Sequence, residues 1–326
     1  MASKQDGVGA ITQADSATEQ VATPQLYLKA DDIQIEGDGQ TISEKSGISP
    51  DRTGVLPVGF NYNFSISGLE PHAYAAGYLW YLALGGCSGA STTHTITPAA
   101  DAQYVNVYKD YKEDISSAGT GETVEVLLGG RITSIEMEVN AKQFCSMNVN
   151  GIGCNLGTPA ASLTASHPTG ANNRALSWNT LRAGQFTIGY NGGAQSLDTS
   201  IVGLKVMYNR TMKPEETTLA DDISDSIVQG PRTLDFEVSR VFKGSAARSE
   251  YNAWKSQWTV GISFKFVVGT YEFEMEIDDA QITGPNADPV GIGEDTIMGK
   301  LRAEAYLDST YLTTITVIDG VTGIYP

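Results

Sequence analysis

The stretch VGFNYNFSIS, from Val58 to Ser67, runs directly into GLEPHAYAAGYLWYLALGG, which ends at Gly86. In the first part, large apolar residues alternate with glycine or polar ones, as in an antiparallel strand with one buried face. The second part has a proline near its start, good helix formers inside and a glycine pair at its end, which predicts a short helix over Ala73–Leu84. That helix is shorter than the ~20 residues needed to span a bilayer, so we expect it to be buried in the protein.

Strand patterns recur through the rest of the chain, which places it in the mainly β class. The first half contains THTITP, QYVNVYKDY, TVEVLLGGRITSIEMEV and FCSMNVNG. The second half contains IVGLKVMYN, RTLDFEVSRVFK, WTVGISFKFVV, TYEFEMEI, KLRAEAYL and LTTITVIDG, and SAARSEYNAWKSQ predicts a second short helix.

The predicted elements follow the same order in both halves, which indicates a tandem duplication of one β-rich domain. Matching features lie 169 to 174 residues apart, among them the loops that begin at Gly37 and Asn209 and the closing strands that end at Gly151 and Gly320. At this spacing SIEMEV aligns with KLRAEAYL. The expected parts are a flexible polar arm over 1–24, a first domain over 25–154, a linker over 155–185 and a second domain over 186–326.

The composition is strongly acidic. The 326 residues include 21 Lys and Arg against 38 Asp and Glu, a formal net charge of −17. This balance argues against a surface that grips nucleic acid, because phosphate binding relies on clustered cations, but it does not exclude a surface that nucleic acid passes. The three cysteines are odd in number and form no C-x-x-C pair, so neither a disulfide framework nor a zinc site is expected.

Sequence motifs of catalysis are absent. The chain contains no P-loop, H-E-x-x-H, G-x-S-x-G or EF-hand loop, and its three histidines have no nucleophile or carboxylate at a telling spacing. Asp221, Asp222 and Asp225 in ADDISDS could hold calcium, but their spacing matches no known calcium loop, so a solvated acidic loop is expected. We therefore expect no catalytic, metal or cofactor site and no enzyme activity.

Two strands carry rows of carboxylates. In YEFEMEID the apolar residues share one face and the acidic residues share the other, and SIEMEV has nearly the same alternation. The simplest interpretation is a solvated outer face, and the alternative is a functional acidic surface. The candidate residues for such a surface are Glu272, Glu274, Glu276, Glu136 and Glu138.

Each half also carries a long polar segment between its first two strands, Gly37–Gly54 and Asn209–Pro231. Loops of this length in a compact domain are usually functional or disordered. Their equivalent places in the two halves favour arms that dock on another subunit over freely solvated loops. The candidate docking residues are Ser43, Glu44, Lys45, Glu215, Glu216, Asp221, Asp222 and Asp225.

The run LPVGFNYNFSISGLEPHAYAAGYLWYLALGG, followed by THTITPAADAQYVNVYKDY and GGRITSIEMEVNAKQFCSMNVNGIG, resembles the major tail tube proteins of long-tailed, non-contractile bacteriophages. As in that family, an alternating strand leads into a short helix ending in Leu-Gly, a His-Thr strand follows, and a strand pair closes the domain. The resemblance covers roughly residues 55 to 153, and the second half fits by element order.

The resemblance implies two tandem β-sandwich or barrel domains, each flanked by a short helix, in a structural virion protein of the tail. It implies self-assembly into stacked rings around a channel. These rings are hexameric for single-domain members, and a chain with two copies would form trimeric, pseudo-hexameric rings or hexamers. Tape-measure, tail-terminator and tail-tip proteins would be partners, assembly would take place in the host cytoplasm, and no membrane anchor is expected. Genomic DNA would pass the acidic lumen without specific binding. The carboxylates expected to face that lumen are those of Glu272, Glu274 and Glu276, with Glu136 and Glu138 as lesser candidates.

Two other classes are kept as alternatives. A carbohydrate-binding or adhesin-type β-sandwich surface protein should expose aromatic residues on a loop or flat face, whereas Tyr and Trp here fall mostly within predicted strands and helices. A secretion-system tube protein is the other alternative, and the long duplicated chain makes it the weaker one.

Overall fold

The protein is mainly β in the computed structural model, which describes residues 7–45, 52–89, 91–111, 124–159, 163, 174–214, 226–242, 252–290, 297–305, 307, 313–322 and 325. The strands are β1 (Gly7–Ala14), β2 (Leu26–Ala30), β3 (Asp32–Lys45), β4 (Arg52–Leu69), β5 (Gly85–Ser88), β6 (Thr93–Pro98), β7 (Tyr104–Asp110), β8 (Val124–Asn140), β9 (Ser146–Gly153), β10 (Asn155–Leu156), β11 (Phe186–Tyr190), β12 (Ser196–Leu197), β13 (Ile201–Pro214), β14 (Ile227–Phe242), β15 (Thr259–Val268), β16 (Tyr271–Val290), β17 (Ile297–Ala305) and β18 (Thr313–Ile318). The helices are α1 (Ala73–Leu84) and α2 (Trp178–Gly184).

Eight strands form one antiparallel layer, which we call the long sheet. Its order is β3–β4–β9–β8–β13–β14–β17–β16. Only the later parts of β8 and β16, Arg131–Asn140 and Ala280–Val290, belong to it. The long sheet therefore takes four strands from each half of the chain.

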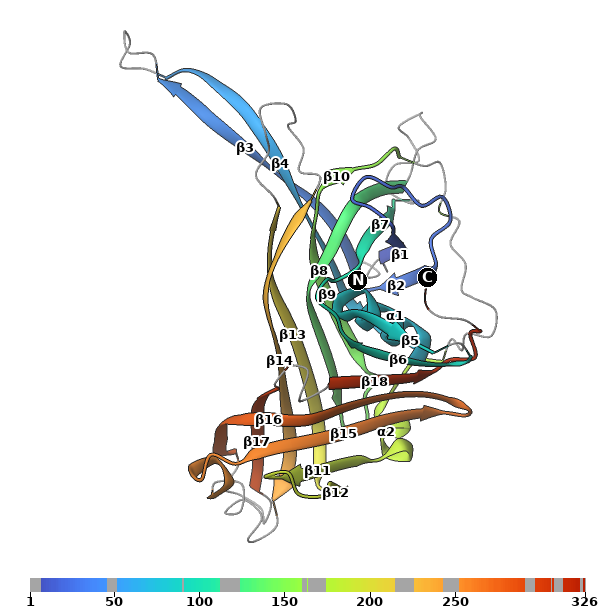
Figure 1. The fold of residues 1–326 in the computed structure, drawn as a ribbon, viewed down its shortest axis with the longest axis vertical. Coiled ribbons are helices and arrows are strands. Elements are labelled where there is room, and N and C mark those ends of the chain that lie inside the picture. The colour runs from blue at the N-terminus through green and yellow to red at the C-terminus, as the bar shows by residue number, and fades with distance from the viewer. Residues whose placement is uncertain are drawn as a thin grey trace, which may run out of the picture.

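The earlier parts of β8 and β16 belong to two smaller sheets. The first small sheet has the order β2–β1–β7–β8–β10. The second small sheet has the order β12–β11–β15–β16–β18–β6–β5. Its strands β15, β16 and β18 cross β13 and β14 of the long sheet at a steep angle (Figure 1).

Helix α1 has the predicted bounds, and all of its residues are buried. Its N-terminus is capped by His72, whose Nδ1 accepts a hydrogen bond from the Ala75 N–H at 3.3 Å. Gly85 ends the helix with a left-handed φ of 90°, which glycine adopts without strain. From the far half of the chain, the Tyr208 hydroxyl donates to the Ala83 carbonyl at 3.2 Å. Both halves therefore contribute to one hydrophobic core around this helix.

Strand pairing follows the same pattern in the two halves. The pairs β1–β2, β1–β7, β3–β4, β4–β9, β7–β8, β8–β9 and β8–β10 recur as β11–β12, β11–β15, β13–β14, β14–β17, β15–β16, β16–β17 and β16–β18. The hairpin β5–β6 follows α1 and has no equivalent among the described strands of the second half. It extends the second small sheet by pairing with β18, so it ties the first half to the second.

This pairing corrects the alignment predicted from spacing. Lys300–Ala305 of KLRAEAYL lie on β17, whose counterpart is β9. The closing strand β18 is the counterpart of β10 rather than of β9. SIEMEV lies on the later part of β8, so it corresponds to the later part of β16. The hairpin β5–β6 lengthens the first half. Equivalent residues of the two halves are therefore separated by fewer residues after α1 than before it, so no single offset aligns them all.

Three further expectations from the sequence differ from the structure. Gly7–Ala14, within the predicted flexible arm, forms β1 between β2 and β7 because its backbone finds pairing partners on both sides. The predicted linker contains β10 and α2 and buries Leu176 and Leu181. Most of the segment Gly37–Gly54 is not a loop but a continuation of the β3–β4 hairpin, which projects away from the body (Figure 1).

Candidate functional site

The two faces of the long sheet differ sharply in chemistry. Along β8, Ile135, Met137 and Val139 are buried, whereas Glu136 and Glu138 between them are partly exposed. Cross-strand pairing carries this alternation across the sheet, so polar residues line up on one face. We call this the polar face, and its polar residues are Asp32, Gln34, Glu36, Asn63, Ser65, Ser134, Glu136, Glu138, Asn140, Asn148, Asn150, Lys205, Asn209, Asp235, Glu237, Ser239, Gln281, Lys300, Arg302 and Glu304.

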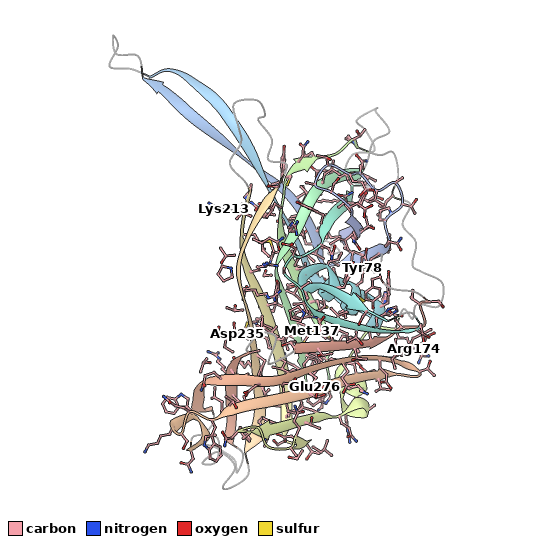
Figure 2. The ribbon with its side chains drawn as sticks, in the orientation of Figure 1. Tyr78, Met137, Arg174, Lys213, Asp235 and Glu276 are labelled. Carbon is pink, nitrogen blue, oxygen red and sulfur yellow. The ribbon has the colours of Figure 1, made fainter. Side chains whose placement is uncertain are left out.

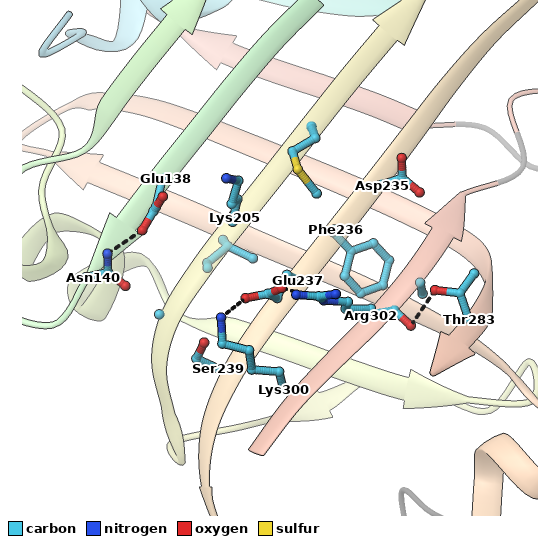
Figure 3. Close-up of a pocket in the computed structure, with 14 residues that line it drawn as sticks. Glu138, Asn140, Lys205, Asp235, Phe236, Glu237, Ser239, Thr283, Lys300 and Arg302 are labelled. Atoms are coloured by element: carbon cyan, nitrogen blue, oxygen red, sulfur yellow. Dashed lines mark hydrogen bonds and ion pairs between the residues drawn. The ribbon is translucent and has the colours of Figure 1, made fainter. Parts of the chain in front are cut away.

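The polar face is hollowed where β8, β13, β14 and β17 lie side by side (Figure 3). The hollow has a volume of about 550 Å³, and charged residues from all four strands line it. The strands of the second small sheet pass behind the hollow in this view, on the opposite side of the long sheet. The hollow thus opens away from the hydrophobic core.

The cations of the polar face are held by carboxylates of the same face. Lys300 Nζ lies 2.5 Å from Glu237 Oε1, and Arg302 Nε lies 2.6 Å from Glu237 Oε2. Burial alone would raise the pKa of Glu237, but the hydrogen bonds from Lys300 and Arg302 outweigh it and lower the pKa. Lys205 Nζ lies 2.9 Å from Glu136. Each cation therefore has part of its charge compensated within the sheet.

Carboxylates are in excess on this face. Among its described residues seven are acidic and three are basic. Asp235 and Glu304 are direct neighbours across β14 and β17. Burial and the adjacent Glu304 both raise the pKa of Asp235, because each disfavours its charged form. The polar face is consequently anionic, and Lys205, Lys300 and Arg302 each contact one of its carboxylates.

The second predicted acidic strand lies elsewhere. Glu272, Glu274 and Glu276 are on the part of β16 that belongs to the second small sheet, between β15 and β18. The predicted burial of the alternating apolar residues is confirmed at Phe273, Met275 and Ile277.

A single lysine on β15 neutralises part of this second acidic surface. Lys265 Nζ lies 3.1 Å from Glu272 and 2.9 Å from Glu274. The hydrogen bond to Glu274 is the largest cause of a raised pKa of the lysine, and the hydrogen bond to Glu272 adds to it. Burial raises the pKa of Glu276, and so do Asp278 and Glu274 nearby. Local charge neutralisation thus recurs here, on a different sheet.

The two acidic strands face opposite directions. The buried faces of the long sheet and the second small sheet pack on a common core, so their polar faces point away from each other. Figure 2 places Asp235 on a long-sheet strand and Glu276 on a strand that crosses it. The five candidate carboxylates therefore do not share one surface. Glu136 and Glu138 share the polar face instead with Asp235, Glu237 and Glu304, as the alternation in LDFEV and LRAEA indicates.

The predicted docking residues fall into two groups. Ser43, Glu44 and Lys45 lie on β3, where the ladder pairs them with Val55, Gly54 and Arg52. The candidates Glu215, Glu216, Asp221, Asp222 and Asp225 lie outside the described residues.

The strands that flank the second docking group form the hairpin β13–β14, which is paired out to Pro214 and Ile227. This hairpin is the counterpart of β3–β4, and both extend toward the same end of the molecule (Figure 1).

A separate polar cluster is closed to solvent. His94, Asp319 and Tyr325 are at most 4% exposed. His94 Nε2 lies 3.4 Å from Asp319, and the Tyr325 hydroxyl donates to the same carboxylate at 2.8 Å. The ring of Tyr325 also stacks on that of His94 and packs edge-on against Tyr74. This enclosed cluster holds the segment around Asp319 and Tyr325 against α1 and β6. Because His94 lies far from Asp319 and Tyr325 in the sequence, no local motif indicates the cluster.

Comparison of the sequence with protein-family models gave no match, and comparison with curated proteins gave none either. Within the described ranges, neither helix has the length and apolar character to cross a membrane. The same ranges contain no group of three or more His, Cys, Asp or Glu side chains arranged to hold a metal ion.

Proposed function

We propose that the chain is the tail tube protein of a long-tailed bacteriophage, a structural virion protein whose copies form stacked rings around a channel for the genome. The observation that carries this proposal is the long sheet. One of its faces is buried and the other is an anionic polar face. Within the described part of the sheet, its edge strands, β3 and the part of β16 from Ile282 on, pair on one side only. Open edges of this length promote pairing with another chain, and closure into a barrel removes them.

The dimensions of the long sheet suit a wide channel. Three copies would contribute three times eight, or 24, strands. At about 4.8 Å between strands, the barrel would have a circumference of roughly 115 Å and a backbone diameter of roughly 37 Å, and strand tilt would widen it. Such a barrel is wide enough for a DNA duplex even when side chains of the barrel strands point into the channel. The tape-measure, terminator and tip proteins follow from the resemblance as further partners.

The charge of the polar face suits transport without binding. Duplex DNA carries one charge per ~1.7 Å of its axis, so free cations along a channel would hold it through many phosphate contacts. Here Lys205, Lys300 and Arg302 form ion pairs with Glu136 and Glu237. The excess carboxylates would repel the phosphates and keep the duplex away from the wall.

The proposal is tested first by electron microscopy of the purified protein, in which rings or tubes with a central channel are expected. Particles that remain monomers under all assembly conditions would contradict it.

The orientation of the channel is tested by charge reversal. Tails with Glu136→Lys and Glu138→Lys should retain DNA in low salt and release it as the salt concentration rises, because these residues would line the channel. The matched control is Glu272→Lys with Glu274→Lys, on the outward face of the second small sheet, which should release DNA as the wild type does. Retention by the control alone would show that the other face lines the channel.

A further inference from the structure

The repeat within the chain can be aligned residue by residue from its strand pairing. In the first half Phe64 pairs with Gly151, and in the second half Phe236 pairs with Ala303, on the equivalent strands. Gly151 and Ala303 are equivalent because each lies opposite the isoleucine, Ile132 or Ile282, that precedes a shift in its ladder. This equivalence aligns NFSIS of β4 with DFEVS of β14. Phe64 also pairs with Ile35 on β3, and Phe236 pairs with Val206 on β13, so Ile35 is the equivalent of Val206.

A bulge fixes the alignment of β8 with β16. The pairing of β8 with β9 shifts between Ile132 and Ser134, and that of β16 with β17 shifts between Ile282 and Gly284. Both bulged positions follow Ile and are threonines, which sets an offset of 150 residues. This offset makes Asn286 the equivalent of Glu136, and it holds up to that residue, because β16 shifts again between Asn286 and Val290 where β8 stays regular.

The two repeats are joined inside the chain by the pairing of β8 with β13. In that junction Glu136 lies opposite Met207, and Glu138 lies opposite Lys205. β8 is the last long-sheet strand of the first repeat, and β13 is the first of the second repeat. Their equivalents are β16 and β3, the two edge strands of the long sheet.

We infer that β16 of one chain pairs with β3 of a second copy of the same chain, in the register of the β8–β13 junction. This inference rests on the proposed ring assembly and adds its register. The equivalences place Glu36 opposite Asn286 of the neighbouring copy. The junction between copies then repeats the junction within the chain, and three copies close into a pseudo-sixfold ring.

The exposure along β3 agrees with this register. Ile33 is buried and Ile35 is partly buried, whereas Gln34 and Glu36 are exposed on the polar face. Pairing in this register would keep the polar face continuous across the junction. A slip by one residue would turn the polar side chains of one strand toward the buried face.

The two prolines in PNADP lie on the segment of β16 that would form the junction. Proline lacks an N–H group, so these two positions cannot donate to a ladder. The junction between copies would therefore have fewer backbone hydrogen bonds than the β8–β13 junction.

The register is tested by disulfide trapping. In a Cys87→Ser background, since Cys145 and Cys154 are buried, assembled protein with Glu36→Cys and Asn286→Cys is oxidised and run on a non-reducing gel. Covalent dimers and trimers are expected, because opposed residues on paired strands bring their Cα atoms within disulfide range. The slipped pair Glu36→Cys with Gly284→Cys should cross-link about tenfold less, because its Cα atoms lie beyond that range.

The junction within the chain supplies the matched control. Glu136→Cys with Met207→Cys occupies the equivalent pair and should form a disulfide inside one chain, with no change in mass on the gel. Rings seen by microscopy without the Glu36–Asn286 cross-link, or with an equally strong slipped one, would overturn the register and leave the proposed function standing. Absence of both rings and cross-link, with the control disulfide formed, would overturn both.

Discussion

At the scale of single residues, Asp235 shows how the polar face is tuned by its neighbours. Its side chain is half-buried and stands directly across from Glu304, and burial and this like charge raise its pKa. A carboxyl group with a raised pKa in the folded state binds its proton more tightly there than in the unfolded chain. Stability therefore falls as the pH rises from the ordinary Asp pKa through the raised value, and the loss persists above it.

We predict that Asp235→Asn raises the melting temperature at pH 7 and leaves it nearly unchanged at pH 3, where the carboxyl group is protonated in both states. The expected gain is small, about 1–2 °C, because the side chain keeps contact with water. Thermal unfolding followed by circular dichroism between pH 3 and pH 7 measures it. The matched control is Glu36→Gln, which removes a carboxylate that lies across from neutral Asn63 and should change the melting temperature at pH 7 little. A variant that melts lower than the wild type at pH 7 would contradict the prediction.

Tyr325 is a residue at which packing and hydrogen bonding can be separated. Tyr325→Phe removes the 2.8 Å hydrogen bond to buried Asp319 and should lower the free energy of unfolding by about 1–3 kcal/mol. Tyr325→Ala also removes the ring that packs on His94 and Tyr74, so its cost should rise to about 3–5 kcal/mol.

Urea unfolding measures both losses at Tyr325. Tyr271→Phe on β16 serves as the control. Tyr271 is partly buried, and within the described part of the chain its hydroxyl makes no hydrogen bond. Equal losses for the Phe and Ala variants of Tyr325 would mean that the ring contributes nothing beyond its hydroxyl.

At the scale of elements, the β3–β4 hairpin is the feature that the body of the protein does not explain. Its ladder continues to Lys45 and Arg52, well beyond the sheet that supports its base (Figure 1). A two-stranded ribbon alone is marginally stable in water. Its length therefore favours a partner that covers it after assembly, which agrees with the proposed contact between rings.

Shortening this hairpin should separate folding from stacking. Replacement of residues 40–59 by Asn-Gly would join Gly39 to Phe60, which are already paired, through a two-residue turn. The expected result is a folded protein that forms rings but no tubes, as judged by electron microscopy. Deletion of Glu215–Ser226, between the counterpart strands β13 and β14, should have the same effect. Tubes of normal length from both variants would show that neither hairpin stacks the rings.

At the scale of the whole molecule, net charge opposes assembly. Each chain carries a formal charge of −17, so copies that approach edge to edge repel one another over a distance that salt shortens. Ring closure would be driven by strand pairing and apolar contact, which salt screens little. We predict faster assembly at about 0.5 M than at about 0.05 M salt, where the Debye length is several times longer. Light scattering measures the rate, and slower assembly at high salt would indicate attraction between charged groups as the main force.

The sequence by itself determined the mainly β class, the bounds and burial of α1, and which residues of the acidic strands are buried. These features depend on local rules: side chains alternate along a strand, and proline and glycine mark the ends of a helix. They hold wherever the element is later placed, which is why Phe273, Met275 and Ile277 could be assigned to a buried face.

Only the tertiary structure decided where those elements lie. YEFEMEID and SIEMEV have the same local pattern, yet they belong to different sheets and face opposite directions, because their partner strands come from distant parts of the chain. The ladder of β3 with β4 and the contact between His94 and Asp319 likewise join residues whose local sequence carries no sign of the partner. Strand pairing is non-local, so the polar face, its neighbours and its open edges appear only when the sheet is assembled.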